Sequence, residues 1–126
     1  MLCANPDITV ERGGRIIYCA GAIARAYEAA GGKVTYAGKP YLPVYDMAFA
    51  ELARLKGSPV PREKTLAIGD GINTDIAGAA AAGIGSVYVA SPVHVKAGAA
   101  LDDATLDSLF PNSSTRPIAA MSRLAW

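Results

Sequence analysis

The sequence is poor in cysteine, histidine and aromatic residues and carries almost no net charge. Its two cysteines, Cys3 and Cys19, lack the spacing of metal ligands, which excludes a cysteine-based zinc site and favours reduced thiols in a cytoplasmic protein over a disulfide. The single histidine, His94, gives little support to a serine–histidine–acid triad built on Ser86 or Ser91. We interpret His94 as an ordinary loop residue.

Acidic and basic residues are interspersed, and the formal net charge is +1 at pH 7. This pattern gives no field that favours nucleic acid or an anionic membrane, so a small soluble substrate is the more consistent partner. Residues 76–95 contain no Asp, Glu, Lys or Arg and are long enough to span a bilayer, but glycine, serine and proline interrupt them. We therefore interpret them as a buried helix followed by a buried strand, and expect no membrane contact.

The 126 residues, 52% of them hydrophobic, suffice for one ordinary domain or a piece of a larger one. Strand-like and helix-like segments alternate, which predicts a layered α/β fold with a parallel sheet. The expected strands are 1–4, 15–18, 34–37, 65–68 and 86–90. The expected helices are 21–30, 43–56, a segment from about 73 to 82, and 102–110. The tail from Pro111 is expected to be irregular up to Ile118 and to end by packing Leu124 and Trp126. In the helix 43–56, the side chains expected to face the core are those of Val44, Met47, Ala48, Leu52 and Leu55.

An acidic turn is the most informative feature of the chain. The apolar run 65–68 ends in Gly69-Asp70-Gly71, where the chain is expected to turn on the two glycines and enter a helix. A second acid, Asp75, follows five residues after Asp70. Open α/β folds place their ligands at the carboxyl ends of such strands, and paired carboxylates suit Mg²⁺. We therefore interpret Asp70 as a direct Mg²⁺ ligand, and Asp75 as a second metal ligand or as an acid that orients its neighbours. The simpler interpretation makes Asp70 a turn former, and Asn73, Thr74 or Asp75 the cap of the next helix.

Lys39, between Gly38 and Pro40, follows another expected strand. One helix separates that strand from the one before Asp70, as in a parallel β-α-β unit, so we expect both residues at the same edge of the sheet. A lysine there can neutralise a phosphate. A P-loop is excluded, because Lys33 and Pro40 occupy positions that would need glycine and Ser or Thr.

A dinucleotide-binding fingerprint is half present from Gly69, but Thr74 replaces its third glycine. It stays a weaker alternative. The turn Asn5-Pro6-Asp7 would by itself be just a turn.

Together these motifs resemble those of the haloacid dehalogenase (HAD) superfamily, in particular the class IIA branch with a large α/β cap. Gly38-Lys39-Pro40 resembles the third motif, residues 69–75 with the Ala/Gly-rich helix resemble the fourth, and Asn5-Pro6-Asp7 resembles the end of the cap. The resemblance implies a three-layer α/β/α Rossmann-like parallel sheet. Residues 1–35 would be the carboxyl-terminal part of the cap, and 36–126 that of the core.

The resemblance also implies a Mg²⁺-dependent phosphatase that acts on a small phosphorylated metabolite through an aspartyl-phosphate. Lys39 would hold the phosphoryl group, Asp70 would bind Mg²⁺, and Asp75 would support the metal site or Lys39. Asn5 and Asp7 would lie on the substrate side. The family's D-x-D nucleophile motif is absent from this sequence. We therefore expect the carboxyl-terminal part of such an enzyme, inactive alone.

Without the nucleophile strand, residues 65–68 would present an unpaired apolar edge. We expect a homo-oligomer, or association with the missing amino-terminal half. Two other functions stay open, namely a non-catalytic nucleotide- or phosphate-binding module and a structural subunit that completes a partner's fold.

Overall fold

The structure, a computed structural model, describes residues 1–91, 94–96 and 99–124. Its strands are β1 (Leu2–Cys3), β2 (Thr9–Arg12), β3 (Arg15–Tyr18), β4 (Thr35–Tyr36), β5 (Leu66–Gly69), β6 (Gly85–Val89) and β7 (Ala119–Met121). Its α-helices are α1 (Ala20–Ala29), α2 (Leu42–Lys56), α3 (Ala77–Ala81) and α4 (Asp103–Leu109). Shorter helical segments are η1 (Arg62–Lys64), η2 (Ile72–Ile76, a π-helical turn) and η3 (Ser113–Thr115).

The first part of the chain contains a hairpin and a two-stranded parallel sheet. β2 and β3 pair antiparallel, with Arg12 opposite Arg15, so the loop consists of Gly13 and Gly14 alone. Both glycines have positive φ, 60° and 74°, as the two central residues of a type I′ turn require. The polar strand β2 was not predicted. β1 pairs in parallel with β4, and α1 lies between the hairpin and β4 along the chain.

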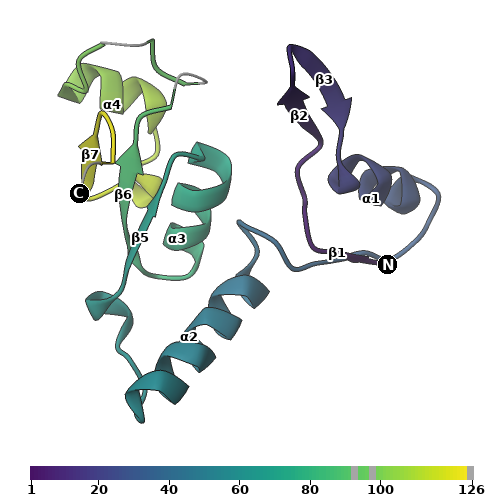
Figure 1. Cartoon of the computed structure of the whole chain (residues 1–126), viewed down its shortest axis with the longest axis horizontal. Helices are drawn as coiled ribbons and strands as arrows, with labels where there is room; N and C mark the ends of the chain where they lie inside the picture. Colours follow the sequence, from purple (N-terminus) through teal and green to yellow (C-terminus); the bar gives the residue numbers. More distant parts are fainter. Residues whose placement is uncertain (92–93, 97–98, 125–126) are drawn as a thin grey trace.

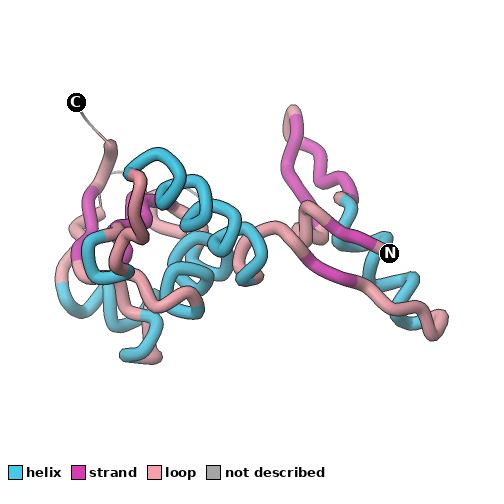
Figure 2. The backbone as a smooth tube through the Cα atoms, turned by 90° about the horizontal axis from the view of Figure 1, so that it is seen from below, coloured by secondary structure: helices cyan, strands magenta, loops and turns pink. Residues whose placement is uncertain are grey.

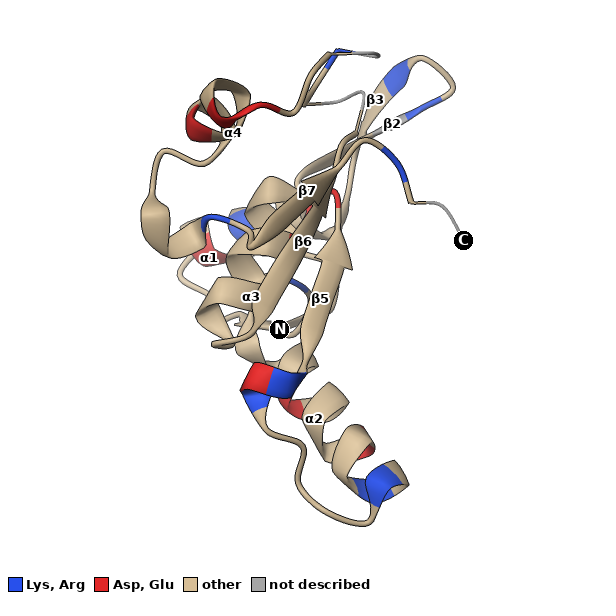
Figure 3. Cartoon of the chain, turned by 90° about the vertical axis from the view of Figure 1, so that its left-hand side faces the viewer, with Lys and Arg blue, Asp and Glu red and all other residues tan. Residues whose placement is uncertain are grey.

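The second part is a parallel sheet in the order β5-β6-β7. Ile68 lies opposite Val87, and Val87 opposite Ala119. Figure 3 shows that these strands carry no charged residue and that α3 packs beside them. The core is formed by Ile76, Tyr88, Val95 and Phe110. The predicted α/β fold with a parallel sheet is confirmed.

β5 is an edge strand in the described part of the chain, where it pairs with β6 alone. The register places Leu66 and Ile68 on one face of the sheet, and their side chains are 49% and 50% exposed. The apolar edge predicted for residues 65–68 is therefore present.

Three of the five core-facing positions predicted for α2 are wrong. Met47 and Leu55 are 73% and 67% exposed, and Ala48 is exposed as well. The buried residue of this helix is Tyr45, whose hydroxyl lies against α3. Because Tyr45 is long and polar only at its tip, it fills the interface between the helices better than the smaller apolar residues.

The two parts are joined by residues 37–41 (Figures 1 and 2). We expected the strand before Lys39 to share a sheet with the strand before Asp70, and this is wrong. β4 is only two residues long and pairs with β1. The Thr35 N–H, within β4, donates to Met1 O, and the Ala37 N–H, just after it, donates to Cys3 O, both at 2.9 Å. The division into residues 1–35 and 36–126 stays a prediction.

Within the described residues, no helix is long and apolar enough to cross a membrane. Residues 76–89 fold as the end of η2, α3 and β6, as the analysis of that uncharged stretch predicted. The chain after α4 was expected to be irregular up to Ile118, but it contains η3, and β7 follows. Leu124 is 45% exposed, and the predicted packing of Trp126 lies outside the described residues.

Candidate active site

An ion pair joins the loop before α2 to the turn after β5. The Lys39 ammonium donates a hydrogen bond to Oδ1 of Asp75. The Lys39 side chain is 52% exposed, whereas that of Asp75 is only 14% exposed. Lys39 therefore keeps access to solvent, while Asp75 is the fixed partner.

Asp75 is held from a second side as well. Its Oδ2 accepts a hydrogen bond from the Gly71 backbone N–H at 3.0 Å. The simpler interpretation of the sequence made Asn73, Thr74 or Asp75 the cap of the next helix. Instead, all three lie inside η2, and the carboxylate of Asp75 reaches back to Gly71 at the start of that turn.

Gly69 and Gly71 make room for these side chains. A Cβ on Gly69 would collide with the Asp75 carboxylate, and one on Gly71 would collide with the Thr74 hydroxyl. Neither glycine has positive φ, and Gly71 lies at φ −81° and ψ 106°. Sequence reasoning interpreted them as turn formers. The structure shows that what they provide is space.

The hydroxyl of Tyr45 was missed by sequence reasoning. It donates a hydrogen bond to the Asp75 carbonyl oxygen at 3.5 Å, and a Cβ on Gly78 would collide with it. Tyr45 and Gly78 together set how closely α2 approaches α3. The signal in the sequence was a glycine within an alanine-rich helix, which marks a close approach of another element.

The electrostatics keep Lys39 charged. The hydrogen bond to Asp75 is the main cause that raises the pKa of Lys39, partial burial opposes it, and the negative charges of Asp75 and Asp70 add to the increase. A lysine with a raised pKa is an ammonium ion at neutral pH. The site therefore has a permanent positive charge at neutral pH.

Asp70 follows β5 directly and is exposed. It lines a cavity of about 320 Å³ together with residues that follow β6, among them Ala90 and Ser91. Lys39 pairs with Asp75 in the turn after that same strand β5, although β4, the strand before Lys39, belongs to another sheet. Among the described residues, no three His, Cys, Asp or Glu side chains form a cluster that could hold a metal ion by themselves.

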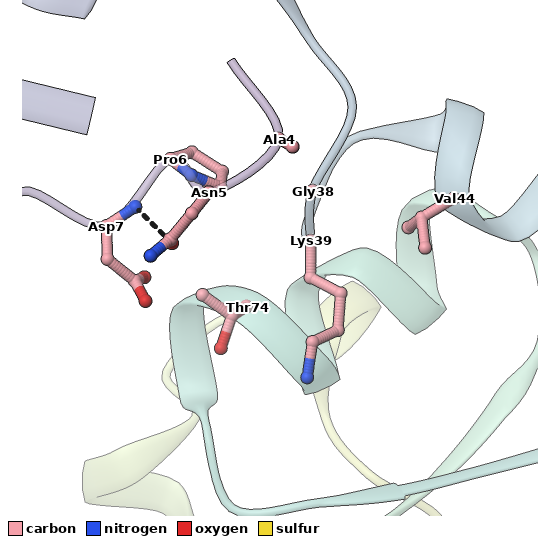
Figure 4. A pocket seen from close by; sticks show the side chains of 8 residues that line it. All are labelled: Ala4, Asn5, Pro6, Asp7, Gly38, Lys39, Val44 and Thr74. Atoms are coloured by element: carbon pink, nitrogen blue, oxygen red, sulfur yellow. Dashed lines mark hydrogen bonds between the residues drawn. The ribbon is translucent and has the colours of Figure 1, made fainter. Parts of the chain in front are cut away.

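A second cavity, of about 350 Å³, lies beside Lys39 (Figure 4). The residues that line it are Ala4, Asn5, Pro6, Asp7, Gly38, Lys39, Val44 and Thr74. The structure therefore brings the turn Asn5–Asp7 to the same cavity as Lys39. Asn5 shapes this turn, since its Oδ1 accepts a hydrogen bond from the Asp7 N–H at 3.1 Å.

The serine–histidine alternative gains no support from the structure. Ser86 and Ser91 are buried, whereas His94 is exposed and its N–H donates to the Ser91 carbonyl at 2.9 Å. Cys3 and Cys19 are both free, as expected.

Comparison with known structures identifies relatives of the whole chain. A haloacid dehalogenase-like hydrolase from Brucella suis is 42% identical with a TM-score of 0.72, and the match covers 98% of this chain and 44% of that one. A 4-nitrophenylphosphatase from Thermotoga maritima is 27% identical with a TM-score of 0.66, covering 97% of this chain and 41% of that one.

A p-nitrophenyl phosphatase from Archaeoglobus fulgidus, 22% identical with a TM-score of 0.65, shares the fold over 97% of this chain and 42% of its own. The chain thus spans less than half the length of these relatives. A search of curated proteins finds no match.

The family comparison agrees with the structural one. Residues 36–112, which include Lys39, Asp70 and Asp75, match the model of the HAD-hydrolase-like family. The chain belongs to the HAD-hydrolase-like family.

Proposed function

We propose that the chain forms the carboxyl-terminal part of a cytoplasmic, Mg²⁺-dependent phosphatase that hydrolyses a small phosphate ester. The observation that carries this proposal is the ion pair of Lys39 with Asp75, beside the exposed Asp70 at the end of β5. A fixed ammonium and a carboxylate at one edge of a parallel sheet suit a phosphate and a hard cation. The names of the Thermotoga and Archaeoglobus relatives support the substrate class.

Lys39 is assigned to the phosphoryl group. An ammonium has three N–H donors, and the hydrogen bond to Asp75 uses one of them. The other two can bind phosphate oxygens, whose negative charge Lys39 offsets. Asp75 positions Lys39, because it holds the ammonium and is itself held by the Gly71 N–H.

Asp70 is assigned to Mg²⁺. Its exposed carboxylate fits a cation that binds proteins through one or two carboxylates and keeps several waters. Both oxygens of Asp75 already accept hydrogen bonds, so this residue fits a supporting role better than that of a second direct ligand. When bound, Mg²⁺ would offset charge on the transferred phosphoryl group.

The attacking carboxylate is assigned to a part of the protein outside this chain. No D-x-D motif occurs in the sequence, and the chain spans less than half the length of its relatives. We propose that the complete protein transfers the phosphoryl group to that carboxylate and then hydrolyses the aspartyl-phosphate. The chain alone is then expected to have no turnover.

The test is Mg²⁺-dependent hydrolysis of p-nitrophenyl phosphate. The chain alone is compared with a chimera in which the amino-terminal part of the Brucella suis relative precedes it. We expect no turnover by the chain and turnover by the chimera. Asp70→Asn and Lys39→Met should abolish chimera activity, whereas the matched changes Glu63→Gln and Lys64→Met, both at exposed positions in η1, should not.

Hydrolysis by the chain alone, lost in Asp70→Asn, would show that a carboxylate within these residues attacks phosphorus. A folded chimera that binds inorganic phosphate through Lys39 without turnover would favour the second candidate, a non-catalytic phosphate-binding module. The absence of a D-x-D motif is the observation that favours this candidate.

A further inference from the structure

The cavity beside Lys39 has opposite charges on its lining. Among the described residues that line it, Lys39 is the cation, and its ammonium pairs with Asp75. In the same described lining Asp7 is the anion, and it is exposed. In Figure 4 the Thr74 hydroxyl lies between the Asp7 carboxylate and the Lys39 ammonium. The cavity therefore offers a positive and a negative group to one ligand.

The turn that carries Asp7 is fixed by backbone hydrogen bonds to the start of α1. The Asp7 carbonyl accepts from the Gly21 N–H at 3.1 Å, and the Ile8 carbonyl accepts from the Cys19 N–H at 2.9 Å. A Cβ on Gly21 would collide with the carbonyl oxygens of Pro6 and Asp7, so only glycine allows this close approach. Asp7 is therefore positioned before a ligand arrives, which lowers the entropic cost of binding.

Two further hydrogen bonds hold the amino-terminal side of the turn Asn5–Asp7. The Cys3 thiol donates to the Asn5 carbonyl at 3.2 Å, and Asn5 Oδ1 accepts from the Asp7 N–H. None of these contacts uses the Asp7 carboxylate. Replacing Asp7 by Asn would therefore remove the charge and leave the turn intact.

We propose that this cavity selects phosphate esters whose alcohol part carries a protonated amine. The phosphate binds at Lys39 and the ammonium at Asp7, with the Thr74 hydroxyl between them. A volume of about 350 Å³ is at the lower end for ligand sites, which restricts the ligand to a small molecule. A carboxylate in place of the amine is disfavoured by the negative charge of Asp7. This inference rests on the proposed function, because it takes Lys39 as the phosphate ligand.

The test is an NMR titration of the full chain with three esters of similar size, namely phosphoethanolamine, ethyl phosphate and phosphoglycolate. Because an exposed ion pair contributes modestly, we expect phosphoethanolamine to bind about threefold more tightly than ethyl phosphate. Phosphoglycolate should bind most weakly. In Asp7→Asn the three affinities should become similar, and the amide spectrum should stay that of a folded chain.

Two control variants separate this inference from the proposed function. Lys39→Met should weaken the binding of all three esters. Asp46→Asn, at an exposed position on α2, should leave the order of the three affinities unchanged. Equal binding of phosphoethanolamine and ethyl phosphate, with Lys39→Met still weakening both, would overturn the role of Asp7 and leave the phosphatase proposal standing. Binding of none of the three, or binding unaffected by Lys39→Met, would overturn the assignment of Lys39 and this inference with it.

Discussion

The ammonium of Lys39 donates a hydrogen bond to the carboxylate of Asp75, which lies thirty-six positions further along the chain. Lys39 stands just before α2, and Asp75 lies within η2, after β5. The ion pair therefore connects the amino-terminal end of α2 to the turn that follows β5. Two further hydrogen bonds hold Asp75 in place: its Oδ2 accepts from the Gly71 N–H, and its carbonyl oxygen accepts from the Tyr45 hydroxyl.

The ion pair predicts a specific pH dependence of stability. Asp75 raises the pKa of Lys39, so the pair stabilises the fold fully below the ordinary lysine pKa of 10.5, and this contribution is lost as pH rises through the raised value. Asp75→Asn should lower the free energy of unfolding by about 0.5 kcal/mol at neutral pH, because Lys39 is half exposed. The difference should shrink above the lysine pKa, as measured by urea unfolding.

Asp75→Asn keeps an oxygen that can accept from the Gly71 N–H, so it isolates the charge. Asp46→Asn serves as the control, because the partner of Asp46 is Arg62, which stays charged. A difference between the wild-type chain and Asp75→Asn that is constant across the pH range would contradict the prediction.

The contact between α2 and α3 predicts that Gly78→Ala is destabilising. The new Cβ would meet the Tyr45 hydroxyl and the Pro40 Cα, which lies 2.9 Å from that position. Overpacking of this kind costs about 1–3 kcal/mol, measurable as a lower midpoint of thermal unfolding. Adding Tyr45→Phe should recover part of the loss, since the hydroxyl is one of the clashing atoms.

Gly85→Ala is the matched control for Gly78→Ala. Its Cβ would meet Ile118 at 3.4 Å and Leu66 at 3.6 Å, which are ordinary contacts. Equal effects of the two glycine substitutions would argue against the close approach of α2 as the cause.

The position of Phe110 in the core predicts that truncation of its side chain causes a large loss of stability. It is buried, and its ring meets that of Tyr88 edge-on with centroids 5.3 Å apart. Phe110→Ala should lower the free energy of unfolding by about 3–5 kcal/mol, because it leaves a cavity in the core. Ile16→Ala, at an exposed position of the β2–β3 hairpin, should change it by less than about 0.5 kcal/mol. Denaturant unfolding of both variants would separate a core from a surface role.

The edge strand β5 predicts association. In the described part of the chain one backbone edge of β5 is unpaired, and this edge, with the exposed Leu66 and Ile68, can pair with a second copy or with an amino-terminal partner. We expect size-exclusion chromatography with light scattering to show self-association, and Ile68→Lys to shift the chain toward monomer. Ile16→Lys on the hairpin should have no such effect. A monomeric wild-type chain, or equal effects of the two lysines, would place the association surface elsewhere or exclude it.

Several local elements could be predicted from the sequence. The apolar run ending in glycines gave β5 within one residue, and Asp102 is the cap of α4, where its side chain accepts from the Thr105 N–H at 2.9 Å. Such features depend on neighbouring residues, whose backbone preferences act over a few positions. The hairpin strand β2 was not predicted, although Gly13-Gly14 was a signal for the turn between β2 and β3.

The placement of the site could be predicted only in outline. Lys39, Asp70 and the turn Asn5–Asp7 were each identified in the sequence, but the expected β-α-β unit was wrong because β4 pairs with β1. Lys39 reaches Asp75 through residues 37–41 and the packing of Tyr45 against Gly78 instead. These are contacts between distant residues, and local patterns do not encode which of several partners a strand takes.

The sequence by itself determined the strand–turn–helix around Asp70, the free thiols and the positions of the charged groups. Only the tertiary structure decided that Gly69 and Gly71 make room for Asp75 and Thr74, that Tyr45 is the buried residue of α2, and that Asp7 shares a cavity with Lys39. The physical reason is range: backbone propensities act between neighbours, whereas packing and charge pairing act between residues that only folding brings together.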